Sequence, residues 1–546
     1  MRKVYTNGTI YTVDENNPWA ETVIIEDGRF TYVGNNDYQA EEGDEVIDLH
    51  GKFALPGLID SHQHWFVPSL VDGPHANVSP IIRESDINVA LEKIAEHVKA
   101  HPEYHSYKAN VGNKENWPRT INIHDLDAIC PDKPLFVHDA GAHSFVGNSR
   151  LMEAIGVTKD TPDLAPNHSY YGHDENGELT GFGSEWTQVA GLAVVNTVTN
   201  EDMRDNLHSL VDFNSSLGIT GVYESGSVAR QKDCYEALHD MDMKGELKGR
   251  VSISNTIVIR SQIKDAVAVQ KEMKEKYESE NITVDTIKIF IDGTTAEYSG
   301  YISKNYVNKK KRGGSVPTPK MLYQLFKEAN EAGFNVHMHT IGNAAAHMIV
   351  KALQKLESET ELKVKFIIAH LQLVNEEDIK ELGRHNICLN GTPHWVGSLR
   401  EPCIDIFTLP EEWRLSNYRY QTLWNTGANM TFSCDVTIMP NVIGAHVWSP
   451  FHGWEIGITR LKVGDMDESH IDDPKECLTL EQLIKGYTIN GAIQMGWEKE
   501  TGSIEVGKSA DMVVLDMNPF EIDTRRLHEL QVEEALFRGN TVYSKE

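Results

Sequence analysis

The chain has 546 residues and a formal net charge of −30, because 81 acidic residues outnumber 51 basic ones. This charge argues against the basic surface of a nucleic-acid-binding protein and against docking on an anionic membrane. A hydrophobic fraction of 40% allows a large core and excludes a wholly disordered chain. The sequence shows no long apolar run, no secretory signal and no CxxC pair, so we expect a cytoplasmic protein.

Both ends of the chain have the sequence pattern of short β-strands. Asn7-Gly8 and Asp27-Gly28 are hairpin signals between alternating apolar residues, and residues 501–546 alternate in a similar way. We therefore predict that residues 1–56 and 501–546 together build a small composite β-sandwich domain.

The middle of the chain, residues 57–500, alternates apolar strand-like runs with helix-like stretches such as Pro319–Ala332. This alternation predicts an α/β fold, a (β/α)8 TIM barrel. The eight candidate strands are Ala54–Ser61, Ile219–Glu224, Arg250–Ile257, Thr286–Ile291, Phe334–Thr340, Val364–His370, Asn386–Leu389 and Asn429–Cys434. The first two strands are too far apart for one βα unit, so an insertion is expected at about 65–215. The basic run 309–312 is interpreted as a solvated loop, with a mobile lid as the alternative.

Histidines mark the end of the first predicted barrel strand. In the segment PGLIDSHQHW, His62 and His64 are two residues apart. On an extended chain this spacing places both imidazoles on one side, which is a natural clamp for a metal ion. An HxH pair also occurs by chance, so the residues of the later strands are needed to decide whether this pair binds a metal ion.

Ligand-type residues recur at the ends of later strands. His337 and His339 end the fifth strand, His370 ends the sixth and Asp435 follows the eighth. Lys288 lies inside the apolar fourth strand, where a lone ammonium needs a modification or a carboxylate partner such as Asp292 or Glu224. Histidine and carboxylate without thiolate suit Zn²⁺, with Mn²⁺ or Fe²⁺ as alternatives. We therefore predict a divalent metal site.

Several motifs together resemble those of a known family. They are PGLIDSHQHW, HSFVGNSRLMEAIGV, NGELTGFGSE, IKIFIDGT, HTIGNAA, IIAHLQL, SCDVTIMP and the stretch from LTLEQLIKGYTINGA to GSIEVGKSADMVVLD. Over essentially the whole length, the chain resembles the amidohydrolase superfamily and, within it, the amidohydrolase-3 branch that includes N-substituted formamide deformylases. The sequence departs from the family pattern at Asn343, Ala369 and Cys434, none of which is a proposed ligand.

The resemblance implies one or two zinc ions per subunit at the barrel mouth. It implies that His62, His64 and Asp435 hold the more buried ion, and that His339 and His370 hold the second. Lys288, as a carbamate, would bridge the two. The implied reaction is hydrolysis of a non-peptide, amide-type C–N bond, of the N-acyl or N-formyl kind, by metal-activated hydroxide. Asp435 would act as general base and then general acid.

Other residues are weaker candidates for the site. His143 could orient the substrate or its oxyanion, or be structural. Glu224, His394 and Trp395 are candidate substrate contacts. Glu185 is a further candidate to face the site, but we expect it to be a carboxylate at the surface or at a helix cap. The expected partners are a small-molecule substrate and, as a candidate assembly, a second copy of the chain.

Two other functions compete with amide hydrolysis. One is a deaminase-type or cyclic-amide hydrolase of the same superfamily. Gly342 counts against a deaminase, because such relatives usually have glutamate at that position. The other is a non-catalytic metal- or small-molecule-binding barrel.

Overall fold

The protein is built around a parallel β-barrel. The structure is a computed structural model that describes residues 2–38, 41–112, 117–139, 141, 143–226, 229–307, 309–384, 386–396, 408–414, 416–435, 448–471 and 473–545. Eight strands form one sheet in the order β21-β20-β19-β18-β17-β16-β15-β8. Their bounds are β8 (Leu58–Gln63), β15 (Ile219–Glu224), β16 (Arg250–Ile257), β17 (Ile282–Phe290), β18 (Asn335–Thr340), β19 (Phe366–His370), β20 (Ile387–Gly391) and β21 (Asn429–Phe432). A parallel bridge between Gln63 and Asp435 links the two edges, so the predicted barrel is confirmed.

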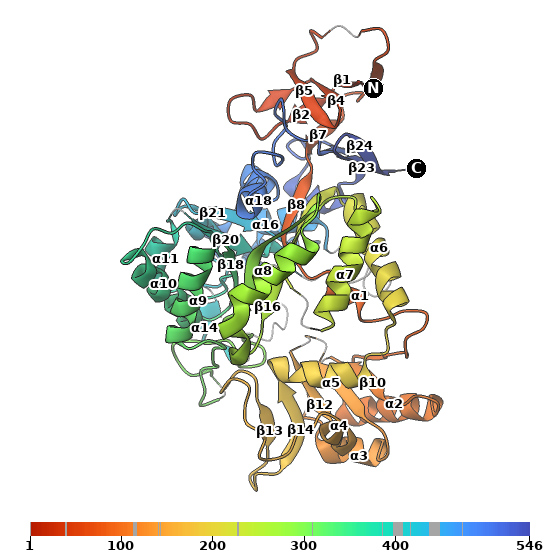
Figure 1. Cartoon of the computed structure of the whole chain (residues 1–546), viewed down its shortest axis with the longest axis vertical. Helices are drawn as coiled ribbons and strands as arrows, with labels where there is room; N and C mark the ends of the chain where they lie inside the picture. Colours follow the sequence, from red (N-terminus) through yellow and green to blue (C-terminus); the bar gives the residue numbers. More distant parts are fainter. Residues whose placement is uncertain are drawn as a thin grey trace.

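Helices follow the barrel strands and lie around the barrel (Figure 1). Their apolar side chains pack with those of the strands in one core. The helix α9 shows why its sequence is helical. Thr318 caps its start by accepting a hydrogen bond from the backbone N–H of Met321, and Gly333 ends it in the left-handed conformation. The helices are α6 (Asn200–Ser216), α7 (Gln231–Met243), α8 (Ala266–Tyr277), α9 (Pro319–Ala332), α10 (Asn343–Glu357), α11 (Glu376–Leu382), α12 (Pro393–Val396), α14 (Glu411–Arg414), α15 (Tyr420–Trp424), α16 (Pro450–Thr459), α17 (Leu480–Gly486) and α18 (Ile489–Met495).

The two chain ends form two further sheets that share a core. The first sheet has the order β5-β4-β1-β6, and the second has the order β24-β23-β22-β7-β2-β3. Their bounds are β1 (Lys3–Thr6), β2 (Thr9–Tyr11), β3 (Trp19–Ala20), β4 (Thr22–Glu26), β5 (Arg29–Gly34), β6 (Glu45–Asp48), β7 (Phe53–Pro56), β22 (Met512–Leu515), β23 (Val532–Phe537) and β24 (Asn540–Ser544). Tyr5, Phe30, Met512 and Leu536 are buried between them, as a β-sandwich requires.

The first predicted strand is two strands in the structure. The segment Ala54–Ser61 is divided at Gly57 between β7, which pairs with β2 and β22, and β8, which pairs with β15. A Cβ atom on Gly57 would lie 2.2 Å from Oγ1 of Thr220. The close approach of the chain to Thr220 therefore requires glycine at the point where it passes from sandwich to barrel.

A long segment between β8 and β15 forms a separate sheet with its own helices. Its strand order is β13-β14-β12-β11-β10-β9. The elements are α1 (Phe66–Ser69), β9 (Ile81–Ile82), α2 (Ile87–Ala100), β10 (Tyr107–Val111), α3 (Ile123–Ile129), β11 (Leu135–Asp139), β12 (Ser144–Gly147), α4 (Ser149–Ala154), β13 (Tyr171–His173), β14 (Leu179–Ser184), the 3-10 helix η2 (Glu185–Thr187) and α5 (Gln188–Val195). This insertion and the sandwich lie at opposite ends of the barrel (Figure 1). Within the described ranges, no helix is long and apolar enough to span a membrane.

Candidate metal centre

Backbone pairing that closes the barrel also brings together the first ligand-type residues. The backbone N–H of His64 donates to the carbonyl of Asp435 at 2.8 Å, and the N–H of Asp435 donates to the carbonyl of His62 at 3.0 Å. The three residues are far apart in sequence but are fixed to one another by main-chain hydrogen bonds. One ligand atom from each lies within 4.8 Å of those of the other two. Residues 436–440 of the motif SCDVTIMP lie outside the described residues.

The Nε2 atom of His62 is at the centre of this cluster. It lies 3.1 Å from Oδ1 of Asp435 and 3.4 Å from Nε2 of His64. The hydroxyl of Ser225 is 2.8 Å away, and Nζ of Lys288 is 3.5 Å away. Two imidazoles, a carboxylate, a hydroxyl and an amine thus surround one small volume, and the His62 side chain is fully buried.

The position of Lys288 follows from strand alternation. Its neighbours Ile287 and Ile289 belong to the main core, where β17 packs against α8. Because alternate side chains point to opposite faces, Lys288 points into the barrel. Its Nζ atom donates to Ser225 Oγ at 2.7 Å.

His339 and His370 complete the group. The ring centroids of His62 and His370 are 4.8 Å apart, as are those of His339 and His370. The Nδ1 atoms of His339 and His370 are buried and have no hydrogen-bond partner among the described residues. Burying a polar atom without a partner is costly, so these nitrogens are arranged to bind something else.

Three of the site residues have an unusual backbone. Glu185, His370 and Asp435 have φ angles of 51°, 72° and 70°, in the left-handed region. Such conformations cost on the order of 1–3 kcal/mol each in non-glycine residues and are found at functional sites. The surrounding structure therefore holds these three side chains in directions that an ordinary backbone would not give.

Burial dominates the protonation of the cluster. It lowers the pKa of His64 to about 4 and that of His339 to about 3, and holds the pKa values of His62 and His370 well below the ordinary value. Burial also raises the pKa of Asp435, against the opposing effect of His64 and Lys288. Neutral imidazole is the form of histidine that binds metal ions.

The residues present fit a divalent metal ion. The set contains neutral imidazoles, a carboxylate and no thiolate, which are donors that Zn²⁺ accepts. The two unpartnered nitrogens, His339 Nδ1 and His370 Nδ1, supply the independent observation that the group is built for a ligand. His62, His64 and Asp435 would hold one ion, and His339 and His370 are the candidate ligands of a second.

His143 and Glu185 come from the insertion and form an ion pair. Nδ1 of His143 is 2.8 Å from Oε2 of Glu185, and Glu185 also accepts a hydrogen bond from the hydroxyl of Ser299. Burial lowers the pKa of His143, but the charge and hydrogen bond of Glu185 outweigh it and raise the pKa to about 9. Glu185 is only 1% exposed, so a surface position is wrong, although it is the first residue of the 3-10 helix η2.

The candidate substrate contacts lie in different surroundings. Trp395 stacks on His370 with 4.8 Å between ring centroids, whereas Nε2 of His394 is 3.0 Å from the carbonyl of Ser449. Glu224 is fully buried, and its Oε2 accepts hydrogen bonds from the backbone N–H of Gly226 and the hydroxyl of Tyr235. The role of all three in binding a substrate stays a prediction.

Two residues beside the cluster have contacts other than those the sequence indicated. His337, level with Lys288 in the strand register, has its Nε2 atom 3.0 Å from Nδ1 of His62 and so orients that ring. Asp292 accepts backbone hydrogen bonds from Tyr301, Ile341 and Gly342, and its Oδ1 is 3.7 Å from Nδ1 of His339. Asp292 is therefore not the partner of Lys288. The sequence signal for the position of His337 beside His62 was its spacing from His339, two residues along the same strand.

Comparison with known proteins identifies the family. The profile of the amidohydrolase family matches residues 45–543. YtcJ, a putative amidohydrolase of Bacillus subtilis (strain 168), is 26% identical over 559 residues, which cover all of both chains. The N-substituted formamide deformylase of Arthrobacter pascens is 24% identical over 565 residues, with 99% of this chain and 98% of the deformylase covered.

A solved structure shares the fold. An uncharacterized metal-dependent hydrolase from Pyrococcus horikoshii OT3 has a TM-score of 0.70 and 20% identity, with 96% of this chain and 99% of that chain covered. The family profile spans all eight barrel strands and the sandwich strands β6, β7 and β22 to β24, but not β1 to β5. On this evidence the chain belongs to the amidohydrolase family.

Proposed function

We propose that the protein is a zinc-dependent hydrolase that cleaves an amide-type C–N bond other than a peptide bond, of the N-acyl or N-formyl kind. The observation that carries this proposal is the convergence of His62, His64 and Asp435 at the barrel closure, beside the unpartnered nitrogens of His339 and His370. Catalytic groups in barrels of this kind lie at the carboxyl ends of the strands. The similarity to an N-substituted formamide deformylase supports the substrate class.

The hydrolysis would use a bound zinc ion and the side chains of Asp435 and His143. A bound zinc ion supplies Lewis-acid polarisation of a carbonyl and lowers the pKa of water towards ~7. Asp435 takes the proton of the attacking water and transfers it to the leaving nitrogen. His143, held as a cation by Glu185, donates a hydrogen bond to the oxygen that gains negative charge.

Deamination and ligand binding without catalysis are the competing functions. Gly342 stands where deaminases of the superfamily usually have an acid, and its backbone N–H donates to Asp292 at 2.8 Å. The glycine favours amide hydrolysis over deamination. A metal-binding barrel without catalysis would hold an ion with the same His62, His64 and Asp435 but would release no product, so the turnover assay separates it from an enzyme.

The experiment combines metal analysis with a substrate panel. The purified full chain is assayed with N-formyl amines, N-acyl amino acids and an aminopurine, before and after chelation and zinc re-addition. We expect zinc in the protein, hydrolysis of at least one amide, loss on chelation and recovery with zinc. Ammonia release from the aminopurine alone, or equal activity without metal, would contradict the proposal.

A further inference from the structure

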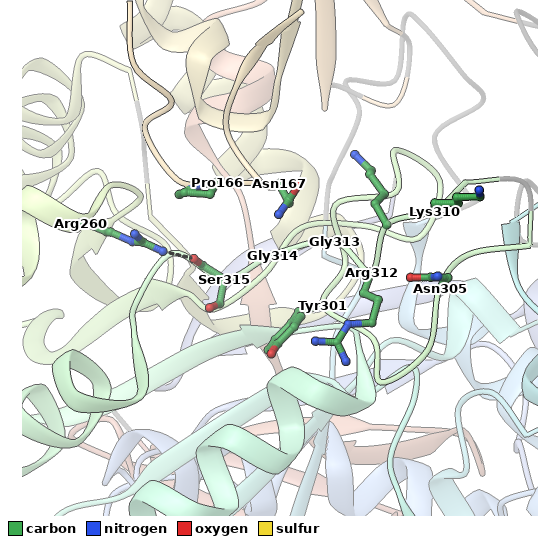
Figure 2. Close-up of a pocket in the computed structure, with 11 residues that line it drawn as sticks. Pro166, Asn167, Arg260, Tyr301, Asn305, Lys310, Arg312, Gly313, Gly314 and Ser315 are labelled. Carbon is green, nitrogen blue, oxygen red and sulfur yellow. Dashed lines mark hydrogen bonds between the residues drawn. The ribbon is translucent and has the colours of Figure 1, made fainter.

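A basic pocket lies where the insertion meets the barrel, outside the candidate metal centre. Its volume is about 440 Å³, and its lining includes Arg260, Lys310, Lys311 and Arg312. Pro166 and Asn167 of the insertion form part of the wall. Figure 2 shows Arg260 on one side of the Gly313–Gly314 segment and Lys310 and Arg312 on the other.

The charges of these four cations are not compensated by ion pairs. Within the described part of the chain, none of them forms a salt bridge, although acidic residues outnumber basic ones by 81 to 51. Arg260 donates to the carbonyls of Val316 and Ser315 at 2.6 and 3.2 Å, and Arg312 donates to the carbonyl of Ser303 at 3.2 Å. Four such cations at one pocket of an acidic protein form a local positive field.

The pocket wall is fixed by main-chain contacts. The backbone N–H of Ile302 donates to the carbonyl of Arg312 at 2.9 Å, and that of Tyr306 donates to the carbonyl of Lys311 at 3.0 Å. A Cβ atom on Gly314 would lie 2.3 Å from the carbonyl oxygen of Pro166. The basic segment is therefore held against both the barrel and the insertion, with glycine at the closest contact.

Side-chain and main-chain contacts connect the pocket to the candidate metal centre and to the insertion. Tyr301 lines the pocket, and its backbone N–H donates at 2.8 Å to Asp292, whose other oxygen is 3.7 Å from His339. Lys311 Nζ is 3.1 Å from the hydroxyl of Tyr170 of the insertion. Burial and the neighbouring Lys309 lower the pKa of Lys311 to about 8, against the opposing effect of Glu297 and Glu185.

We propose that this pocket binds the phosphate or carboxylate group of an acidic small molecule. Arginine and lysine are the usual partners of such oxyanions, and the pocket offers both kinds beside backbone that is already ordered. The acidic group belongs either to the substrate itself, a case that rests on the proposed function, or to a separate anion.

The first test measures binding of inorganic phosphate to the full chain by calorimetry. We expect the double variant Lys310→Ala/Arg312→Ala to bind at least ~10-fold more weakly, because two charged hydrogen-bond donors are lost. The matched control is Lys271→Ala/Lys499→Ala, which removes two exposed lysines elsewhere. Any phosphate that binds at a metal ion does so in all three proteins. A difference in phosphate affinity between them therefore measures binding in the pocket. Equal affinity in the wild type and the double variant would overturn the proposal.

The second test identifies the source of the oxyanion with paired N-formyl substrates, one neutral and one carrying a carboxylate. If the double variant loses kcat/KM for the acidic member only, the substrate supplies the group. If both members keep their kcat/KM while phosphate binding is lost, a separate anion is the occupant. If the proposed function is wrong, neither substrate is hydrolysed. The difference in phosphate affinity between the wild type and the double variant is still measured in that case.

Discussion

The Nδ1 atom of His143 lies 2.8 Å from Oε2 of Glu185, and the hydroxyl of Ser299 holds the same carboxylate from the loop that follows β17. A Cβ atom on Gly293 would lie 2.2 Å from Oε1 of Glu185, so only glycine lets the carboxylate approach this closely. The insertion therefore supplies a charged pair, His143 and Glu185, that is hydrogen-bonded to a loop of the barrel.

Replacing Glu185 by glutamine tests whether the pair matters for catalysis. Without the carboxylate charge, burial of His143 prevails and the imidazole loses its proton near neutral pH. We expect kcat to fall about 10²-fold, which is the scale of losing one oxyanion donor. Glu178→Gln, which removes an exposed carboxylate paired with Lys159, is the control.

The pH profile separates this role from a purely structural one. In the wild type the pKa of His143 is about 9, with Glu185, Glu297 and Asp139 all raising it. Activity that needs the cation is thus present below this pH and declines above it. In Glu185→Gln the declining limb of kcat/KM should move to lower pH. An unchanged profile would show that His143 takes no part as a cation.

Asp435→Asn should preserve the fold and lower kcat by at least ~10²-fold, the usual contribution of a general acid–base group. The amide has nearly the same shape as the carboxylate, and the backbone of residue 435 keeps its pairing with residues 62 and 64. Metal content must be measured on the same sample. Near-normal kcat with full metal would exclude a proton-transfer role for Asp435.

The double variant His62→Ala/His64→Ala should lose turnover and most of the bound metal. The two imidazoles supply two of the three groups that converge at the barrel closure. His105→Ala/His124→Ala, at exposed positions of the insertion, serves as the control. Metal analysis and circular dichroism are the readouts, and a folded double variant with full metal content would argue against this site.

Strand ends were predictable where apolar alternation is uninterrupted. β15 (ITGVYE) and β16 (RVSISNTI) match their predicted bounds, because each is a short run rich in β-branched and apolar residues that begins directly after a glycine. The division at Gly57 was not predictable, since the signal is the approach of Thr220, far along the chain. The candidate ligands could be named because parallel strands bring their ends to one edge. The burial of Glu185 could not be predicted from the sequence, because it depends on a contact between the insertion and Ser299.

A buried ion pair joins the composite sandwich to the barrel and predicts a large effect on stability. Asp511 contacts the guanidinium of Arg250 and also accepts hydrogen bonds from Thr501, Ser509 and the backbone of Arg538. Asp511→Asn should lower the free energy of unfolding by ~3–5 kcal/mol, because it leaves the buried charge of Arg250 unpaired.

The control for that change is Glu500→Gln. Glu500 pairs with Arg29 at 2.9 Å, but both side chains are about half exposed. An exposed pair contributes at most ~1 kcal/mol, so the two variants should differ clearly in denaturant titrations. Similar losses would mean that Asp511 does not anchor the sandwich to the barrel.

The last prediction concerns the chemical state of Lys288. Burial lowers its pKa to about 7, although Asp435 and Glu224 act in the opposite direction. Near neutral pH a substantial fraction is therefore the neutral amine, which is the form that attacks CO2. The new N–C bond and the loss of a proton give a carbamate anion, which two cations can share. The alternative is an ammonium that keeps its hydrogen bond to Ser225 beside a single ion.

Crystals grown with bicarbonate and excess zinc decide between these states. We expect branched electron density beyond Nζ of Lys288, in contact with metal. Lys108 on β10 of the insertion is an internal control, because burial lowers its pKa too, to about 8, but it lies outside the histidine cluster and should stay unbranched. An unbranched Lys288 away from any metal, in crystals where zinc is bound, would exclude the carbamate, because a shared anion cannot form without the added carbon.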